Sequence, residues 1–214
     1  MAEERPALPV ADPAPLGLGA FALTTFLLSA HNAFGATSAP LLAVLGFAFF
    51  YGGLAQLLAG MWEFRNRNVF GATAFSTYGG FWLGVATLVV LALAGKIAGK
   101  DLSLAQGWIL LAFAIFNTYM LLWSARLNVA SFAVFLTLEI TEILLFIGNF
   151  AGNAPGAGLV AIGGYVGLLT ALCAWYASAA GVINGMSARP VLPVGSPLWP
   201  DAAVTAAPGR PVEA

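Results

Sequence analysis

Two acidic residues, Glu139 and Glu142, lie three positions apart within one long apolar stretch of this sequence. A carboxylate at the centre of a bilayer costs roughly 2.5–3.5 kcal/mol on insertion scales, so it normally faces the interior of a helix bundle or a water-filled path. Residues three apart share one face of a helix, so both side chains should point into one environment. The pair could carry protons or gate a solute. Equally, two protonated acids could simply bond to neighbouring side chains or across a subunit contact.

A second group of polar side chains also lies inside or at the end of apolar stretches. Histidine suits proton sensing near neutral pH, but a hydrogen-bonded histidine at the membrane interface is the commoner case for His31. The other members need partners inside the protein, because lipid offers none. They could line a solute path or simply join helices, and their spacing alone does not decide between these roles. These members are Tyr51, Gln56, Tyr78 and Asn149.

The composition indicates a protein whose solvent is lipid. Of the 214 residues 60% are hydrophobic and only 8% are charged, whereas soluble domains average about 25% charged residues. The mean hydropathy of +0.90 agrees. The net charge of -1 gives no reason to expect a nucleic-acid partner. We therefore expect an integral, multi-pass membrane protein, in contact with lipid.

No enzyme signature is present in the sequence. It has no phosphate-binding loop, no HExxH motif and no cysteine cluster, and its GxGxxG-like spellings lie inside apolar stretches, where glycines serve packing. The single cysteine, Cys173, cannot form an internal disulfide, and one histidine cannot build a metal site alone. We expect no enzyme activity, no cofactor and no metal.

Six apolar stretches are long enough to cross a bilayer, which takes about 20 residues in a helix. They are apolar on every face, which favours buried helices over the alternating strands of a barrel. The predicted fold is an all-α, six-transmembrane-helix bundle, formed by residues 13–184 between an N-terminal segment, 1–12, and a partly disordered tail, 185–214. The stretches are residues 16–31, 41–62, 70–94, 106–123, 129–151 and 159–183.

Lysine and arginine are unevenly divided between the two sides of this bundle. An even number of spans puts both termini on one side, and basic residues are enriched on the cytoplasmic side of membrane proteins. The other side holds only Lys96 and Lys100. Both termini should therefore be cytoplasmic, most simply at a plasma membrane. The basic residues on the terminal side are Arg5, Arg65, Arg67, Arg126 and Arg189.

The segment 12–18, DPAPLGL, should start the first helix. Aspartate is a strong N-cap and proline is well tolerated at the first helical position. The first fifteen residues are Pro-rich and acidic, so we expect no cleaved signal peptide. A helix N-terminus attracts anions, although Asp12 would oppose an anion here.

Seven segments in order resemble those of the acetate uptake transporter family, the acetate/succinate permeases and fungal ammonia/acetate export proteins. The resemblance spans residues 12–195. DPAPLGL resembles that family's NPAPLGL signature. The other segments are SAHN at 29–32, FYGGLAQLLAGMWEF at 50–64, FGATAFSTYGGFW at 70–82, IGNFAGN at 147–153, GYVGL at 164–168 and VLPVG at 191–195.

The resemblance implies a homo-hexamer of six-helix subunits, each with its own path for acetate, succinate or similar small carboxylates. It implies proton-coupled symport or channel-like passage through a hydrophobic constriction. By motif the constriction residues are Phe21, Tyr78 and Leu138, and Ala174 matches a small residue beside the path. Rings of apolar side chains gate by excluding water, so neutral acetic acid should cross more easily than acetate. Further candidates for lining the path are Pro13, Leu16 and Gly17 in the signature, with Tyr51, Gln56 and Asn149.

Two features depart from the family pattern. Asp12 replaces the signature's first asparagine, and Glu139 and Glu142 have no counterpart in the pattern. Glu142 lies one helical turn beyond Leu138, so it should face the constriction. It could act as a proton site, together with Glu139 or His31, or shift selectivity. The alternatives are a channel for another small solute such as ammonia, and a non-transporting membrane receptor or structural protein.

Overall fold

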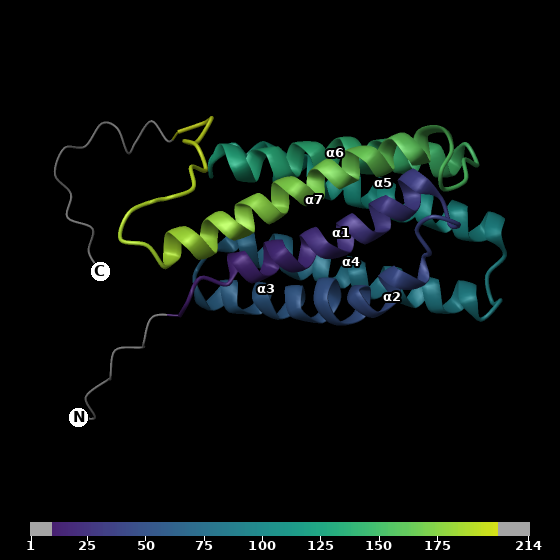
Figure 1. Ribbon diagram of the computed structural model, residues 1–214, viewed down its shortest axis with the longest axis horizontal. Helices are drawn as coiled ribbons and strands as arrows, with labels where there is room; N and C mark the ends of the chain where they lie inside the picture. The colour runs from purple at the N-terminus through teal and green to yellow at the C-terminus, as the bar shows by residue number, and fades with distance from the viewer. Residues whose placement is uncertain (1–9, 201–214) are drawn as a thin grey trace, which may run out of the picture.

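The computed structural model describes residues 10–200, and within that range all the regular structure is helical (Figure 1). Between residues 10 and 200, six helical spans are long and apolar enough to cross a membrane. This confirms the predicted six-helix bundle and the multi-pass membrane class. The spans are α1 (Ala14–Phe34), a composite second span (Leu42–Arg65), α4 (Val69–Leu93), α5 (Gly99–Ser124), α6 (Val129–Phe150) and α7 (Gly158–Gly185).

The second span is not one regular α-helix. It consists of α2 (Leu42–Phe49), a π-helical segment η1 (Phe50–Ala55) and α3 (Gln56–Arg65). Such π segments are rare and often occur at functional sites. This one lies against α1, where a Cβ on Gly52 would collide with the side chain of Thr24.

The predicted connection between the third and fourth spans, residues 95–105, is wrong. The chain turns within a few residues of Gly95, which has a φ of 65°, and α5 already begins at Gly99. Lys100 and Asp101 therefore lie in its first turn. An acidic side chain is favourable there because it complements the helix dipole.

Helix α1 begins one residue later than an Asp12 N-cap would place it. Pro13 is the N-cap residue, yet the Ala14 N–H still donates to Asp12 Oδ1 over 2.9 Å. Asparagines cap two other spans: Asn68 accepts from Gly71 N–H at the start of α4, and Asn128 accepts from Ser131 N–H at the start of α6.

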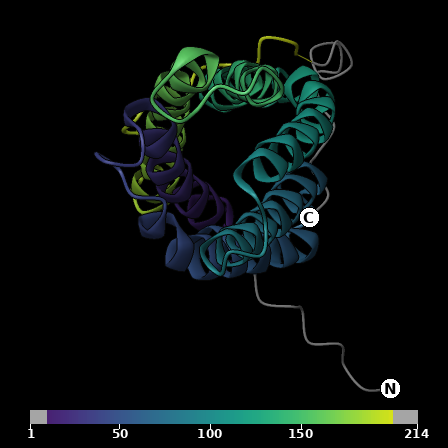
Figure 2. The same ribbon diagram turned by 90° about the vertical axis from the view of Figure 1, so that its right-hand side faces the viewer.

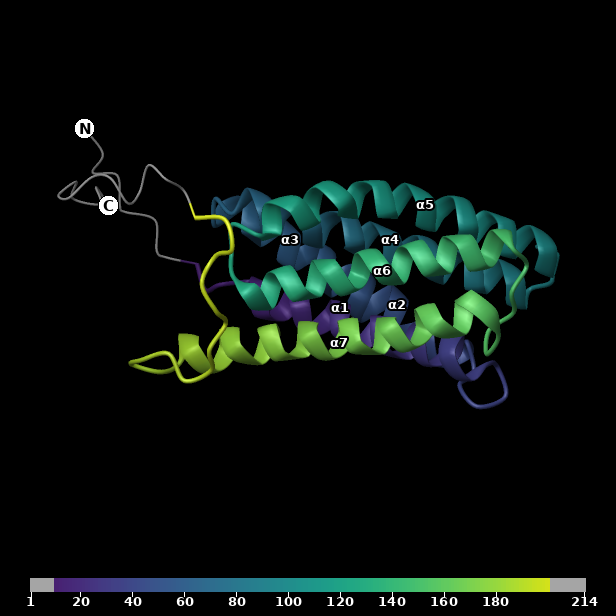
Figure 3. The same ribbon diagram turned by 90° about the horizontal axis from the view of Figure 1, so that it is seen from above.

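The spans lie roughly side by side (Figure 3), and viewed end-on they surround a common centre (Figure 2). Helix α1 packs against α7, α7 against α6, and α6 against α5, while α2 and α3 pack against α4. Glycines allow the closest approach, between α1 and α7. A Cβ on Gly164 would collide with the backbone of Ala33, and one on Gly167 with the Ser29 hydroxyl. Small residues at such contacts are typical of membrane helices.

The start of α1 and the end of α7 lie at the same end of the bundle, which we call the terminal end (Figure 1). The opposite end, where α1 joins α2, α4 joins α5 and α6 joins α7, is called the loop end. The placement of the terminal end in the cytoplasm stays a prediction.

The chain after α7 packs back onto the bundle as far as residue 200. Trp199 stacks on Trp123 with ring centroids 6.1 Å apart, and its backbone N–H donates to the Ala125 carbonyl over 2.9 Å. Ala130 N–H donates to the Val194 carbonyl, also over 2.9 Å. The predicted disorder of the tail's end concerns residues 201–214, which lie outside the described range, as do residues 1–9.

The α1–α7 contact leads to a prediction about stability. Gly164→Ala should destabilise the protein by about 1–3 kcal/mol, because the added methyl overpacks a backbone contact. Gly84→Ala is the matched control, since nothing lies within 4 Å of its Cβ position. Thermal unfolding in detergent measures both variants. Equal melting temperatures would contradict the close approach of α1 and α7.

Candidate functional site

Three cavities follow one another along the bundle and share walls. The loop-end cavity has a volume of about 510 Å³, the central chamber about 40 Å³ and the terminal-end cavity about 230 Å³. The loop-end cavity and the chamber share Leu28, Asn32, Phe81, Leu110 and Leu145. The chamber and the terminal-end cavity share Phe21, Tyr78 and Leu138.

The second shared wall consists of the three residues that the resemblance assigns to a constriction. Phe21 comes from α1, Tyr78 from α4 and Leu138 from α6, and all three are buried. The rings of Phe21 and Tyr78 meet edge to face with centroids 5.6 Å apart. Ala174 on α7 belongs to the same apolar cluster, although it lines none of the three cavities.

A hydrogen-bonded network crosses three helices at this wall. The Tyr78 hydroxyl lies 3.1 Å from Asn117 Oδ1 and 3.2 Å from Glu142 Oε1. Asn117 Nδ2 donates to Glu139 Oε2 over 2.8 Å and to the Phe135 carbonyl over 3.0 Å. The network thus links α4, α5 and α6 through groups that lipid could not satisfy.

Asn117 and its neighbour Thr118 are not among the residues predicted from the sequence. The Thr118 hydroxyl donates to Glu139 Oε1 over 2.8 Å, and Asn117 is fully buried. The sequence feature that could have pointed to Asn117 is an asparagine within the fourth apolar stretch, in the segment FNTYM at 116–120.

The two glutamates share this network but have different surroundings. Glu142 is buried and lines the central chamber, whereas Glu139 is partly exposed between α5 and α6. Three residues advance an α-helix by about 300°, which leaves about 60° between the two directions. That angle is enough to turn Glu142 to the chamber and Glu139 to the bundle's flank.

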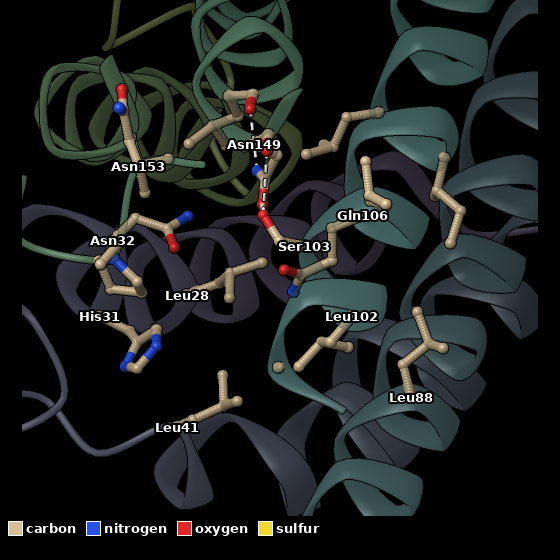
Figure 4. Close-up of a pocket in the computed structure, with 18 of the residues that line it drawn as sticks. Leu28, His31, Asn32, Leu41, Leu88, Leu102, Ser103, Gln106, Asn149 and Asn153 are labelled. Atoms are coloured by element: carbon tan, nitrogen blue, oxygen red, sulfur yellow. Dashed lines mark hydrogen bonds between the residues drawn. The ribbon is translucent and has the colours of Figure 1, made fainter. Parts of the chain in front are cut away.

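A few polar side chains face the loop-end cavity, whose lining is otherwise mostly apolar (Figure 4). Asn149 accepts from the Ser103 hydroxyl through Oδ1 and through its carbonyl, at 3.2 and 3.0 Å. His31 Nδ1 lies 2.7 Å from the Ala39 carbonyl, which makes that nitrogen the donor. Asn32 and Gln106 face the same space.

The signature segment reaches the terminal-end cavity through residues other than those predicted. Ala14 and Leu18 line that cavity. Leu16 is exposed on the outside, Pro13 is buried, and a Cβ on Gly17 would collide with the Phe75 ring. The Ala14 N–H at this helix start already donates to Asp12 Oδ1, so it is not free to bind an anion.

The remaining predicted residues divide between this cavity and the helix contacts. Gln56 lines the terminal-end cavity, and its buried Oε1 has no hydrogen-bond partner. The Tyr51 hydroxyl lies beside Gly19 on α1 and outside the three cavities. An unpredicted acid, Glu63, is fully buried near Gly71, with Oε1 unpartnered. Within residues 10–200 no group of three or more histidine, cysteine, aspartate or glutamate residues could hold a metal ion.

Comparison with known proteins points to one family. The model described as the GPR1/FUN34/yaaH family matches residues 2–196. The succinate-acetate/proton symporter SatP of Escherichia coli is 40% identical over 190 residues, covering 87% of this chain and 96% of that protein. A solved structure titled "Structure of the bacterial acetate channel SatP" matches with a TM-score of 0.80 and 35% identity, covering 87% of this chain and all of the other.

A yeast relative is named for a different solute. "Ammonia transport outward protein 2" of Saccharomyces cerevisiae is 41% identical over 176 residues, which cover 80% of this chain. The matched part spans only 61% of the length of that yeast protein.

The network at the shared wall yields a prediction about stability. Asn117→Ala leaves Glu139 and the Phe135 carbonyl without this donor, so it should destabilise the protein by about 1–3 kcal/mol. Thr87→Val is the control, because that exposed hydroxyl bonds only to a carbonyl of its own helix. Thermal unfolding in detergent measures both variants. Equal melting temperatures would contradict a stabilising role for Asn117.

Proposed function

The chain belongs to the GPR1/FUN34/yaaH family, and from this premise we propose that it transports acetate and similar short carboxylates across the membrane. The observation that carries the proposal is the wall of Phe21, Tyr78 and Leu138, the residues that line both the central chamber and the terminal-end cavity. A small solute crosses the bundle by passing between these three side chains.

The wall favours a solute that is small and uncharged at the moment of passage. An apolar constriction excludes water, and a bare anion there loses its hydration without gaining a countercharge. Undissociated acetic acid carries no net charge and has one apolar methyl group. The loop-end cavity, where Asn32, Gln106 and Asn149 offer polar groups in a mostly apolar lining, holds the solute before or after that step.

The proposal includes assembly and orientation. The subunits form a homo-hexamer with one path each, and both termini lie in the cytoplasm. Glu139 favours an adjacent subunit at this side of the bundle. Its carboxyl is partly exposed at membrane depth, and contact with lipid there would be costly. The particle mass in lipid nanodiscs tests the assembly; a mass equal to one subunit would contradict it.

Ammonia is the second candidate solute. The name of the yeast relative, an ammonia transport outward protein, supports it. So does the unpartnered Glu142 Oε2 at the chamber, which can accept from an N–H donor. Competition between labelled acetate and methylammonium separates the two solutes.

Uptake by purified protein in liposomes tests the main proposal. Labelled acetate should enter faster than into empty liposomes, and faster at lower pH, because more of the solute is then undissociated. Absence of protein-dependent uptake, with or without a pH gradient, would refute acetate transport.

Leu138→Ala tests whether the shared wall limits passage. Removing the side chain widens the wall, so uptake of bulkier acids such as succinate should rise severalfold relative to acetate. Leu136→Ala is the control on the same helix, because Leu136 is exposed and lines no described cavity. An equal succinate-to-acetate ratio in both variants would place the limiting step elsewhere.

A further inference from the structure

The chain after α7 crosses the terminal end of the bundle as a strap, which we define as residues 189–199 (Figures 1 and 3). One side chain near the end of α7, that of Asn184, fastens the first half of the strap. Asn184 Oδ1 accepts from the backbone N–H groups of Val191 and Leu192 over 2.8 and 2.9 Å. Its Nδ2 donates to the Leu192 carbonyl over 2.8 Å. Three hydrogen bonds to the strap therefore depend on this one residue.

The second half of the strap is bound to the α5–α6 turn, residues 125–128, and to the start of α6. The Val194 carbonyl accepts from the Ala130 N–H over 2.9 Å, which satisfies one of the N–H groups that the first turn of a helix leaves unpaired. The backbone N–H of Trp199 donates to the Ala125 carbonyl over 2.9 Å. The strap therefore ties the outer side of the α5–α6 turn to α7.

The inner side of the same turn lines the terminal-end cavity. Leu127 and Asn128 of the turn line it, together with Ser131 in the first turn of α6. Two further lining residues lie at helix starts on the other side of the cavity, Ala14 on α1 and Asn68 at the N-cap of α4. None of these five residues is buried. Together they form the mouth of the cavity at the terminal end of the bundle.

The three parts of this mouth are supported differently. The start of α1 is bound directly to α7, because the Ser178 hydroxyl donates to the Pro15 carbonyl over 2.6 Å. The start of α4 lies directly on α3, where a Cβ on Gly71 would collide with Glu63 Oε1. The α5–α6 turn has less support on the α4 side, since α4 and α5 make few direct contacts. Its position therefore depends on the packing of α6 against α7 and on the strap.

We propose that the strap positions the α5–α6 turn as the lip of the terminal-end mouth, and that Asn184 is the positioning residue that fastens it. The fastened strap limits outward movement of the turn. Release of the strap lets the turn move away from α4 and widens the mouth. The proposal rests on the transport function proposed above, because the terminal-end cavity lies on the proposed path. It assigns control of access to a segment outside the six spans.

The labelling rate of a cysteine placed at Ser131 measures access through the mouth. The full chain with Cys173→Ala and Ser131→Cys is held in lipid nanodiscs and treated with a water-soluble methanethiosulfonate reagent. Adding Asn184→Ala removes three hydrogen bonds of the strap, so labelling should become severalfold faster. Ser187→Ala is the matched control just after α7, because that hydroxyl donates to the Ile183 carbonyl of α7. Equal labelling rates in the two variants would overturn the proposal.

A second pair of variants releases the strap at its other attachment. Gly195 has a φ of 77°, and a Cβ there would collide with Val129 at the start of α6. Gly195→Ala should therefore also speed labelling at Ser131→Cys, whereas Gly185→Ala should not, because nothing lies within 4 Å of its Cβ position. A cysteine placed instead at Ser103, in the loop-end cavity, should be labelled at one rate in all these variants. Faster labelling at both cavities would indicate a loosened bundle and contradict a positioning role.

Acetate uptake in liposomes relates the mouth to the proposed path. Complete labelling of the Ser131→Cys variant should stop protein-dependent uptake, because the reagent then occupies the terminal-end cavity. Uptake unchanged by complete labelling would place the mouth outside the path and overturn the proposal, while leaving acetate transport intact. Absence of uptake before labelling would instead defeat the transport function, on which the labelling rates do not depend.

Discussion

The Tyr78 hydroxyl is the point at which the polar and apolar parts of this bundle meet. Its ring forms the shared wall with Phe21 and Leu138, while its oxygen joins Asn117 on α5 and Glu142 on α6. Lipid cannot satisfy these polar groups, so the three helices must stay close enough to satisfy one another. The same contacts therefore hold the wall's aromatic ring in place and set the chemistry of the chamber beside it.

Close packing on one side of the bundle complements the cavities on the other. Glycines on α7 let α1 approach at backbone distance, as at Gly164 and Ala33. The cavities lie between α1, α4, α5 and α6, where α4 and α5 make few direct contacts. The same six spans thus form both the close α1–α7 contact and the cavities. The positions of the glycines determine which helices approach closely.

The sequence predicted the fold well because hydrophobic length is a strong signal in a membrane chain. This signal is sufficient to predict the six spans. The errors occur where the local backbone conformation determines the structure. The early start of α5 at Gly99 depends on a turn at Gly95, and the π-helical segment Phe50–Ala55 depends on packing against α1. Neither the turn nor the π-helical segment changes the pattern of apolar residues along the sequence.

The candidate site was predictable in part for a similar reason. Phe21, Tyr78 and Leu138 are far apart in the chain, and only the ordered family motifs pointed to them together. Glu142 was visible as an acid in an apolar stretch. Its direct contact with the Tyr78 hydroxyl, which also bonds to the buried Asn117, depends on helix rotation, which composition does not encode. Gln56, Asn149 and His31 lie at cavities, whereas Tyr51 and Gly17 serve helix contacts.

A cryo-electron microscopy structure of the full chain in lipid nanodiscs with acetate is the most direct measurement of the central claim. We predict solute density along the path through each subunit, next to the wall of Phe21, Tyr78 and Leu138. Density confined to contacts between subunits, with none beside this wall, would contradict the proposed path.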